Sequence, residues 1–129
     1  MIVALRTDKP LAELYIAANR KIIKEFSWEA HRKLADTIHT KIADLLQSNR
    51  ADWDDITGLI VYKGPGSFTG LRIGITVANT LASSMKIPII GSQGDDWLEN
   101  GLVALYDGNN DLIVLPEYGG SIHITVPKK

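Results

Sequence analysis

The residues whose types and spacing could support chemistry are concentrated in one glycine-rich run. It reads Gly64-Pro65-Gly66-Ser67-Phe68-Thr69-Gly70-Leu71-Arg72-Ile73-Gly74. Glycine permits positive φ and close backbone approach, proline fixes one φ, and Ser67 could cap the first turn of a helix that follows. Backbone amides at a helix N-terminus favour an anion, so phosphate binding is the first chemistry to consider.

The established phosphate motifs fit this run poorly. A Walker loop ends in Gly-Lys-Ser/Thr, but here Gly70 is followed by Leu71 and Arg72. A dinucleotide-binding fingerprint requires a glycine at the position that Thr69 occupies. Ser67 also lacks the glycine two residues to either side that a nucleophile elbow requires, because Pro65 and Thr69 stand there. A tight strand-to-helix turn with a capped helix is therefore favoured, and nucleotide binding stays open as an alternative.

Other residue types that could do chemistry are too scattered to form a catalytic or metal site. His31 and His39 lie eight residues apart on a predicted helix, about 12 Å along its axis, which is too far to share one metal. His123 has no acid or histidine at ligand spacing, and the pairs Asp54-Asp55 and Asp95-Asp96 are typical of turns and caps. Cysteine is absent. We therefore expect no catalytic residue and no metal ligand.

The elements that must position the glycine run can be predicted from hydrophobic periodicity. Alternating or continuous apolar residues predict three strands before it, a helix with an apolar stripe, a short turn, one strand leading into the run, a helix following it and a further strand. The expected ranges are 1–5, 11–18 and 20–26 for the first three strands, 31–48 for the helix, 52–56 for the turn, 58–62 for the central strand and 87–90 for the last strand. A tight turn is expected at Asn19.

The helix after the glycine run carries more apolar surface than one sheet requires. Its main stripe is Leu71, Ile75, Ala78 and Leu81, while Ile73 and Val77 lie on another side. The extra pair is either a wider buried face of an ordinary monomer or an exposed apolar surface that marks an interface.

The eleven-residue run, with Ala78-Asn79-Thr80-Leu81-Ala82 and Ile87-Pro88-Ile89-Ile90-Gly91, closely resembles the TsaB (YeaZ-type) family. That family is the partner subunit in bacterial threonylcarbamoyladenosine (t6A) modification of transfer RNA. The resemblance extends more loosely to Ile2–Asp8 and His31–Leu46, and so covers about the first ninety residues.

The resemblance implies an α/β fold. It predicts the ribonuclease-H-like lobe of actin-like ATPases (ASKHA), a mixed sheet of order βββαβαβ over residues 1–91. Residues 92–129 are expected to form a short β-rich extension in place of the family's second lobe. Its strands are predicted at 102–106, 112–116 and 122–126, separated by turn-forming residues.

The resemblance also implies a non-catalytic role. In actin-like ATPases the first strand carries an aspartate that organises metal and phosphate, but Arg6 stands at the matching position here. Asp8 would share the same face of an extended chain and could partly substitute, although two residues displace it by roughly 6.6 Å. Loss of nucleotide hydrolysis is therefore the favoured interpretation.

By the same resemblance, this chain docks on a TsaD-like catalytic subunit through its two helices. TsaD would transfer threonylcarbamoyl to adenosine 37 of transfer RNA, a TsaE-like ATPase could join the complex, and the chain alone would form a homodimer. The expected interface residues are His31, Leu34, Ile38, Gly70, Ile73, Gly74 and Val77.

Composition limits the partners and the compartment. A net charge of −1 and only three cations between residues 63 and 91 predict that transfer RNA is reached indirectly through the complex. We expect no cofactor on this chain alone, with ATP or ADP and a metal possible in the assembled complex. The short apolar start and the lack of cysteine predict a cytoplasmic protein without a membrane segment. Two alternatives remain: a homodimeric binding module detached from transfer RNA modification, and a nucleotide-binding enzyme of the ASKHA type.

Overall fold

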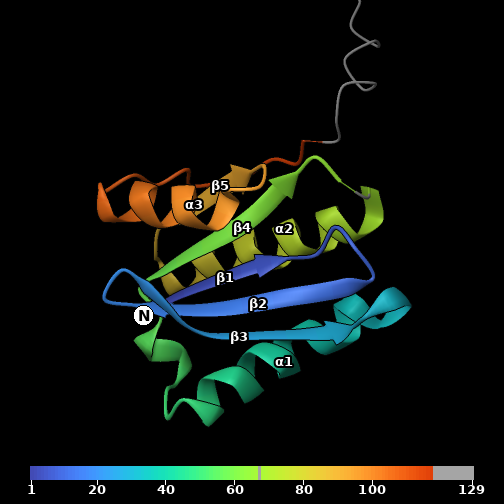
Figure 1. The fold of residues 1–129 in the computed structure, drawn as a ribbon, viewed down its shortest axis with the longest axis horizontal. Helices are drawn as coiled ribbons and strands as arrows, with labels where there is room; N and C mark the ends of the chain where they lie inside the picture. The colour runs from blue at the N-terminus through green and yellow to red at the C-terminus, as the bar shows by residue number, and fades with distance from the viewer. Residues whose placement is uncertain (67, 118–129) are drawn as a thin grey trace, which may run out of the picture.

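Five strands form one mixed sheet in the order β3-β2-β1-β4-β5 (Figure 1). The computed structural model describes residues 1–66 and 68–117, with the backbone alone for His31 and Phe68. The strands are β1 (Ile2–Arg6), β2 (Leu11–Ala18), β3 (Lys21–Glu29), β4 (Gly58–Gly64) and β5 (Ile89–Gln93). β1, β2 and β3 pair antiparallel, whereas β4 pairs parallel to β1 and to β5.

The three-stranded meander follows from local sequence. Asn19 and Arg20 both adopt positive φ, at 53° and 68°, and form the two-residue connection between β2 and β3. Two successive positive φ values match the twist of a tight hairpin. β3 continues to Glu29, three residues beyond its expected end, because Trp28 still pairs with Ala12 on β2.

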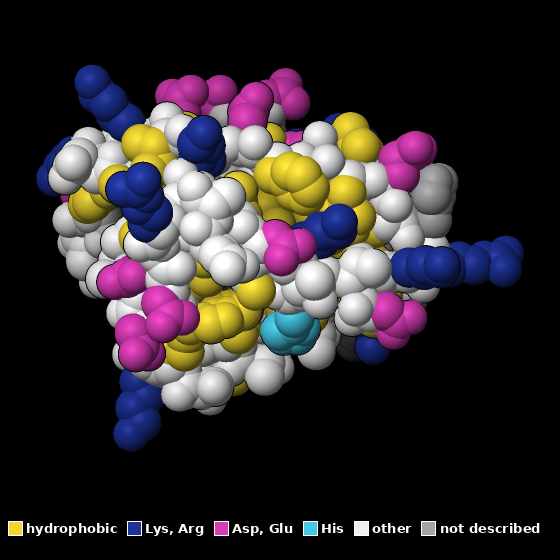
Figure 2. Space-filling view, turned by 90° about the horizontal axis from the view of Figure 1, so that it is seen from below, with side chains coloured by type: hydrophobic (Ala, Val, Ile, Leu, Met, Phe, Trp, Pro, Cys, Tyr) yellow, Lys and Arg dark blue, Asp and Glu magenta, His cyan; other side chains and the backbone are white. Residues whose placement is uncertain are grey.

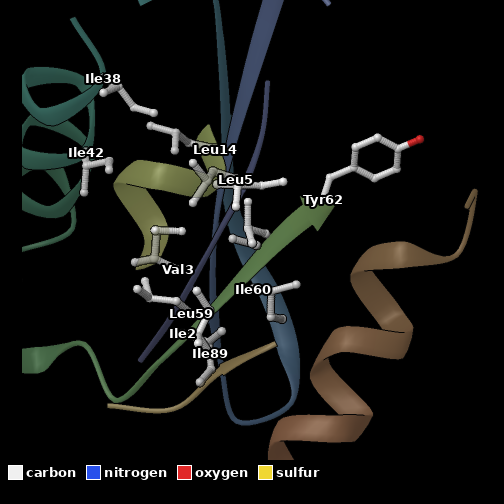
Figure 3. Packing of buried hydrophobic residues seen from close by; sticks show 14 of the residues in the cluster. Ile2, Val3, Leu5, Leu14, Ile38, Ile42, Leu59, Ile60, Tyr62 and Ile89 are labelled. Carbon is white, nitrogen blue, oxygen red and sulfur yellow. The ribbon is translucent and has the colours of Figure 1, made fainter. Parts of the chain in front are cut away.

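Helices cover both faces of the sheet. A short 3-10 turn, η1 (His31–Lys33), leads into α1 (Leu34–Ser48), and η2 (Trp53–Asp55) precedes β4. α2 (Phe68–Met85) follows the glycine-rich loop, and α3 (Trp97–Tyr106) follows β5. Figure 3 shows α3 on the opposite side of the strands from α1. The ribonuclease-H-like arrangement of strands and helices is therefore confirmed.

The core lies between the sheet and its helices. α1 buries the apolar stripe that its periodicity predicts, namely Leu34, Ile38, Ile42, Leu45 and Leu46. Ile38 and Ile42 point from α1 toward Leu14 on β2 (Figure 3). The 3-4 spacing of these residues places them on one face of the helix, so the same pattern that predicts the helix also fixes its orientation.

The predicted strands after residue 91 are wrong where the structure describes them. Residues 102–106 belong to α3, which buries Trp97, Gly101 and Leu102 at helical spacing. Residues 112–116 form no strand, and Leu112 begins that stretch with φ of +66°. The short apolar run at 102–106 cannot distinguish strand from helix by periodicity alone, and leucine and alanine favour helix. The third predicted strand, 122–126, lies outside the described residues.

α3 packs against β4 and β5. It covers the face of the sheet opposite α1 (Figure 3). The role of residues 92–129 in place of a second lobe stays a prediction. Among the described helices, none is both long and apolar enough to cross a bilayer.

Candidate functional site

The glycine-rich loop lies at the carboxyl end of β4, directly beside the end of β1. The Tyr62 hydroxyl donates a 2.7 Å hydrogen bond to the carbonyl oxygen of Pro65. At Gly66 a Cβ would lie 2.5 Å from the Cβ of Asp8, closer than two carbons can approach. Glycine is therefore required at position 66 because the loop packs directly on the segment that follows β1.

Arg6 and Asp8 form a bidentate ion pair beneath this loop. Arg6 Nε lies 2.7 Å from Asp8 Oδ1, and Nη2 lies 3.2 Å from Oδ2. The side chains are 18% and 7% exposed. Burial lowers the pKa of Arg6, but its hydrogen bond to Asp8 and the carboxylate charge outweigh that effect and raise the pKa overall. Both carboxylate oxygens of Asp8 are thus engaged by a permanently charged guanidinium.

Aromatic side chains close the site on the α3 side. The guanidinium carbon of Arg6 lies 3.8 Å from the centroid of the Tyr62 ring, in cation–π contact. Trp97 meets the rings of Tyr62 and Tyr15 edge to face, each at 5.8 Å between centroids. Burial raises the pKa of the Tyr62 hydroxyl, although the charge of Arg6 opposes this shift. The end of β1 is therefore held by packing as well as by charge.

Thr7 fixes the start of α2 on β1. Its Oγ1 donates a 2.7 Å hydrogen bond to the carbonyl oxygen of Gly70. A Cβ at Gly74, one turn further along α2, would lie only 2.1 Å from the same Oγ1. The carbonyl oxygen of Gly70 thus accepts a hydrogen bond from Thr7, whereas the missing side chain of Gly74 leaves room for Thr7.

Two neighbouring hollows lie outside this junction, on the side of α1 and α2. One, of about 360 Å³, lies between the two helices and is lined by Ala35, Thr69, Arg72, Ile73, Thr76 and Val77. The other, of about 430 Å³, extends toward Asp8 and Lys9 and shares Thr69 and Ile73 with the first. We call the lining of the first hollow the α1–α2 groove.

The molecular surface near α1 is mixed in character. Figure 2 looks onto the molecule from the side of α1 and β3 and shows apolar side chains in separate patches between charged ones. Ile22, Ile23 and Phe26 on β3 are 38%, 47% and 39% exposed. A partner that binds on this side would meet both apolar and charged groups.

The predicted interface residues divide between surface and core. Leu34 and Ile38 are 4% and 0% exposed, so their assignment to a partner-facing surface is wrong. They form the stripe with which α1 covers its own sheet, and sequence periodicity alone cannot tell which apolar face is turned inward. Gly74 is also buried, against Thr7.

Ile73 and Val77 are partly buried against the core and line the groove. Gly70 is half-buried, whereas Thr69 and Arg72 are exposed. Ser67 and the side chains of His31 and Phe68 lie outside the described residues, so the predicted cap by Ser67 is not tested. Sequence reasoning missed Ala35 and Thr76, because small residues on a polar helix face give no apolar signal.

A metal site is not formed by the described side chains. Within residues 1–66 and 68–117, no three histidine, aspartate or glutamate residues gather closely enough to hold an ion.

The sequence matches a known family over most of its length. Residues 23–115 match the family model of TsaD, tRNA N6-adenosine threonylcarbamoyltransferase. The chain belongs to this family. Among its curated relatives, the tRNA threonylcarbamoyladenosine biosynthesis protein TsaB of Escherichia coli is 35% identical over 104 residues, 69% of this chain and 45% of the relative.

A tRNA N6-adenosine threonylcarbamoyltransferase of Geotalea uraniireducens is 30% identical over 98 residues, 74% of this chain and 28% of the relative. YeaZ from Pseudomonas aeruginosa superposes with a TM-score of 0.66 at 23% identity, over 71% of this chain and 43% of that one. Within the family this chain is of the TsaB (YeaZ) type, and it spans less than half the length of these relatives.

Proposed function

We propose that this chain is a non-catalytic subunit of t6A biosynthesis that binds a TsaD-like catalytic subunit through the α1–α2 groove. The complex would transfer threonylcarbamoyl to adenosine 37 of transfer RNA in the cytoplasm. A TsaE-like ATPase, with ATP or ADP and a metal, would act in the assembly. This chain would work by contacting the active conformation of TsaD better than the inactive one.

The α1–α2 groove is the observation that supports this proposal most directly. α2 buries Leu71, Ile75 and Ala78 against the sheet. Ile73 and Val77 lie outside this stripe and are only partly buried. Their contribution instead is an apolar floor between two helices, bordered by Thr69, Arg72 and Thr76. Such a floor accepts the ridge of a partner helix, as in helix-to-helix packing within a protein core.

The Arg6–Asp8 pair supports a non-catalytic role. A carboxylate that organises a metal must offer free oxygen ligands, and both oxygens of Asp8 accept from Arg6. Because Asp8 is also covered by Gly66, it cannot easily turn toward a ligand above the loop. These contacts favour loss of nucleotide hydrolysis over substitution by Asp8.

Two other functions lead to different measurements. A nucleotide-hydrolysing enzyme would show saturable ATP binding by the isolated chain, lost on deleting residues 67–69. A homodimeric module detached from transfer RNA modification would dimerise through the same groove and ignore TsaD.

Light scattering after size exclusion tests the proposal. The chain is measured alone and mixed with TsaD from the same genome, with and without ATP, as wild type, Val77→Glu and Ser84→Glu. Val77 lines the groove, whereas Ser84 is exposed near the other end of the same helix. We expect a complex with TsaD for wild type and Ser84→Glu only. An unchanged self-dimer of the wild type in the presence of TsaD would refute the proposal, and equal binding by Val77→Glu would refute the groove as the interface.

A further inference from the structure

The β5 edge of the sheet is closed by hydrogen bonds from the segment after α3. The N–H of Ile89 donates to Asn110 Oδ1 at 3.1 Å, and the N–H of Gly91 donates to Asp111 Oδ2 at 2.8 Å. The N–H of Asp111 in turn donates to the carbonyl oxygen of Ile89 at 2.8 Å. These bonds take the place of a neighbouring strand, so the β5 edge is not available for pairing with another chain.

The opposite edge of the sheet is β3, and it is not closed in this way (Figure 1). β3 pairs with β2 along one side, and no strand among residues 1–66 and 68–117 pairs with its other side. Every second residue directs its N–H and C=O groups to that outer side. Of the nine residues in β3, Trp28 is half-buried and the other eight are exposed. β3 is therefore a template on which a further strand can pair.

A bulge limits the part of β3 that can pair regularly. Lys24 pairs with Ile16 and Ile22 pairs with Ala17, so Ile23 is an extra residue in the ladder. A bulge bends and twists its strand locally. Regular pairing at the outer edge is therefore confined to residues 24–29.

One face of this regular part combines a cation with two aromatic rings. Lys24, Phe26 and Trp28 share that face because side chains alternate along a strand. The rings of Phe26 and Trp28 stack with 6.0 Å between centroids, and Phe26 is still 39% exposed. An exposed aromatic ring at an unpaired edge is a group that a further strand would cover.

Symmetry restricts how a second copy of β3 could supply that strand. A two-fold axis perpendicular to the sheet makes the two strands antiparallel and keeps the same face of both sheets on one side. Opposed residues then share a face, so the axis passes through a residue and not between two. Two such axes pair five of residues 24–29, one at Phe26 and one at Ser27. The axis at Ser27 sets Glu25 opposite Glu29 of the second copy, and like charges directly opposite are unfavourable.

We propose that two copies of this chain pair antiparallel through β3, about a two-fold axis at Phe26. Phe26 then meets Phe26 of the second copy, and Lys24 lies opposite the ring of Trp28, where a cation and an aromatic face attract. Main-chain hydrogen bonds between the two edges supply the rest of the affinity. The lining of the α1–α2 groove contains no residue of β3, so a chain paired in this way keeps its groove for TsaD. The inference thus goes beyond the proposed function.

Disulfide trapping with single substitutions tests the position of the axis, because the chain contains no cysteine of its own. In Phe26→Cys the two thiols are directly opposed, with Cα atoms about 4.5 to 5.5 Å apart, which a disulfide bridges. In the matched control Lys24→Cys, the two copies of the residue are displaced by four positions, roughly 13 Å along the strands. Both proteins are oxidised mildly and separated on a non-reducing gel. We expect a linked dimer for Phe26→Cys and mostly free thiol for Lys24→Cys.

Light scattering after size exclusion tests the dimer itself, over a dilution series and without TsaD. The variants are Phe26→Lys, which sets two lysines opposite each other, and Ile22→Lys, which lies before the bulge on a side chain of nearly equal exposure, 38%. Circular dichroism checks that each variant is folded. We expect twice the mass of one chain for wild type and Ile22→Lys, and the mass of one chain for Phe26→Lys.

Three results would overturn the proposal. The first is a wild type that keeps the mass of one chain at every concentration, and the second is equal linking of Phe26→Cys and Lys24→Cys. The third is a dimer that Val77→Glu abolishes and Phe26→Lys leaves intact, since the groove would then be the self-association surface. None of these measurements contains TsaD, so failure here is separable from failure of the proposed function.

Discussion

Gly74 illustrates how one missing side chain fixes the relation between α2 and β1. An alanine there would gain up to about 1 kcal/mol in helix propensity but would bring its Cβ to 2.1 Å from Thr7 Oγ1. Thr7 is 2% exposed and cannot move outward. We expect Gly74→Ala to destabilise the fold by about 1 to 3 kcal/mol in urea unfolding, as overpacking does.

A second substitution distinguishes this clash from a general effect on the helix. Thr7→Ala removes Oγ1 and loses the hydrogen bond to Gly70, at a cost of about 1 kcal/mol. If the clash is the cause, the double variant Thr7→Ala/Gly74→Ala is more stable than Gly74→Ala alone. Additive losses from the two substitutions would contradict that explanation, because contacting residues should couple.

Tyr15 should make stability depend on alkaline pH. Burial and the hydrogen bond to Glu13 raise the pKa of its hydroxyl in the folded protein above the ordinary value of 10.0. The unfolded chain therefore releases this proton first, and the stability present below pH 10 is lost as pH rises further. Thermal melts between about pH 9 and pH 11 should show a smaller loss of Tm for Tyr15→Phe than for wild type. Equal losses would argue against this role of Tyr15.

At the scale of elements, Trp97 is the largest side chain that α3 buries against the sheet. Trp97 is 4% exposed and packs edge to face against Tyr15 and Tyr62, which come from β2 and β4. We expect Trp97→Ala to cost about 3 to 5 kcal/mol, a typical loss for a buried aromatic residue. Val103 is 59% exposed on the same helix, so Val103→Ala should change stability by less than about 0.5 kcal/mol. Urea unfolding of both variants measures the two losses of stability. Similar losses would contradict the packing of Trp97 between α3 and the sheet.

The elements that the sequence predicts well are those whose local pattern has one solution. Leu34, Ile38 and Ile42 repeat at helical spacing over about two turns. Asn19 marks a two-residue turn between alternating strands. The segment at 102–106 is too short for either period to dominate, and in the structure it belongs to a helix whose Trp97 packs against Tyr62. Which stripe faces inward is likewise a tertiary property, so Leu34 and Ile38 could not be separated from Ile73 and Val77 by pattern alone.

The same reasoning applies to the candidate site. The position of the loop can be predicted from the glycine-rich run, because closely spaced glycines are typical of a tight strand-to-helix junction. The spacing of Arg6 and Asp8 predicts that the two residues share one face of an extended chain, but not that they form an ion pair. Its enclosure by Tyr62 and Gly66 depends on residues nearly sixty positions away, which sequence periodicity does not connect.

At the scale of the whole molecule, charge decides how this chain could meet transfer RNA. Fourteen lysines and arginines are balanced by 15 aspartates and glutamates. Lys9 and Arg32 line the hollow that extends from the α1–α2 groove, but Arg6 is neutralised by Asp8 within the core of the site. A chain with a net charge of −1 has no excess of cations with which to release many counterions from a nucleic acid, so it should rely on its partner for that contact.

This argument predicts the salt dependence of binding. We expect the isolated chain to retain no transfer RNA at about 0.15 M ionic strength, where exposed charges are screened beyond about 8 Å. In complex with TsaD, the slope of log K against log salt should be unchanged by Lys9→Gln and Arg32→Gln together. If both residues contacted phosphates, the slope would fall in magnitude by roughly 1.8 for duplex-like RNA treated as B-DNA. Filter binding over a salt series measures the slope, and a change of that size would show that this subunit contacts the nucleic acid directly.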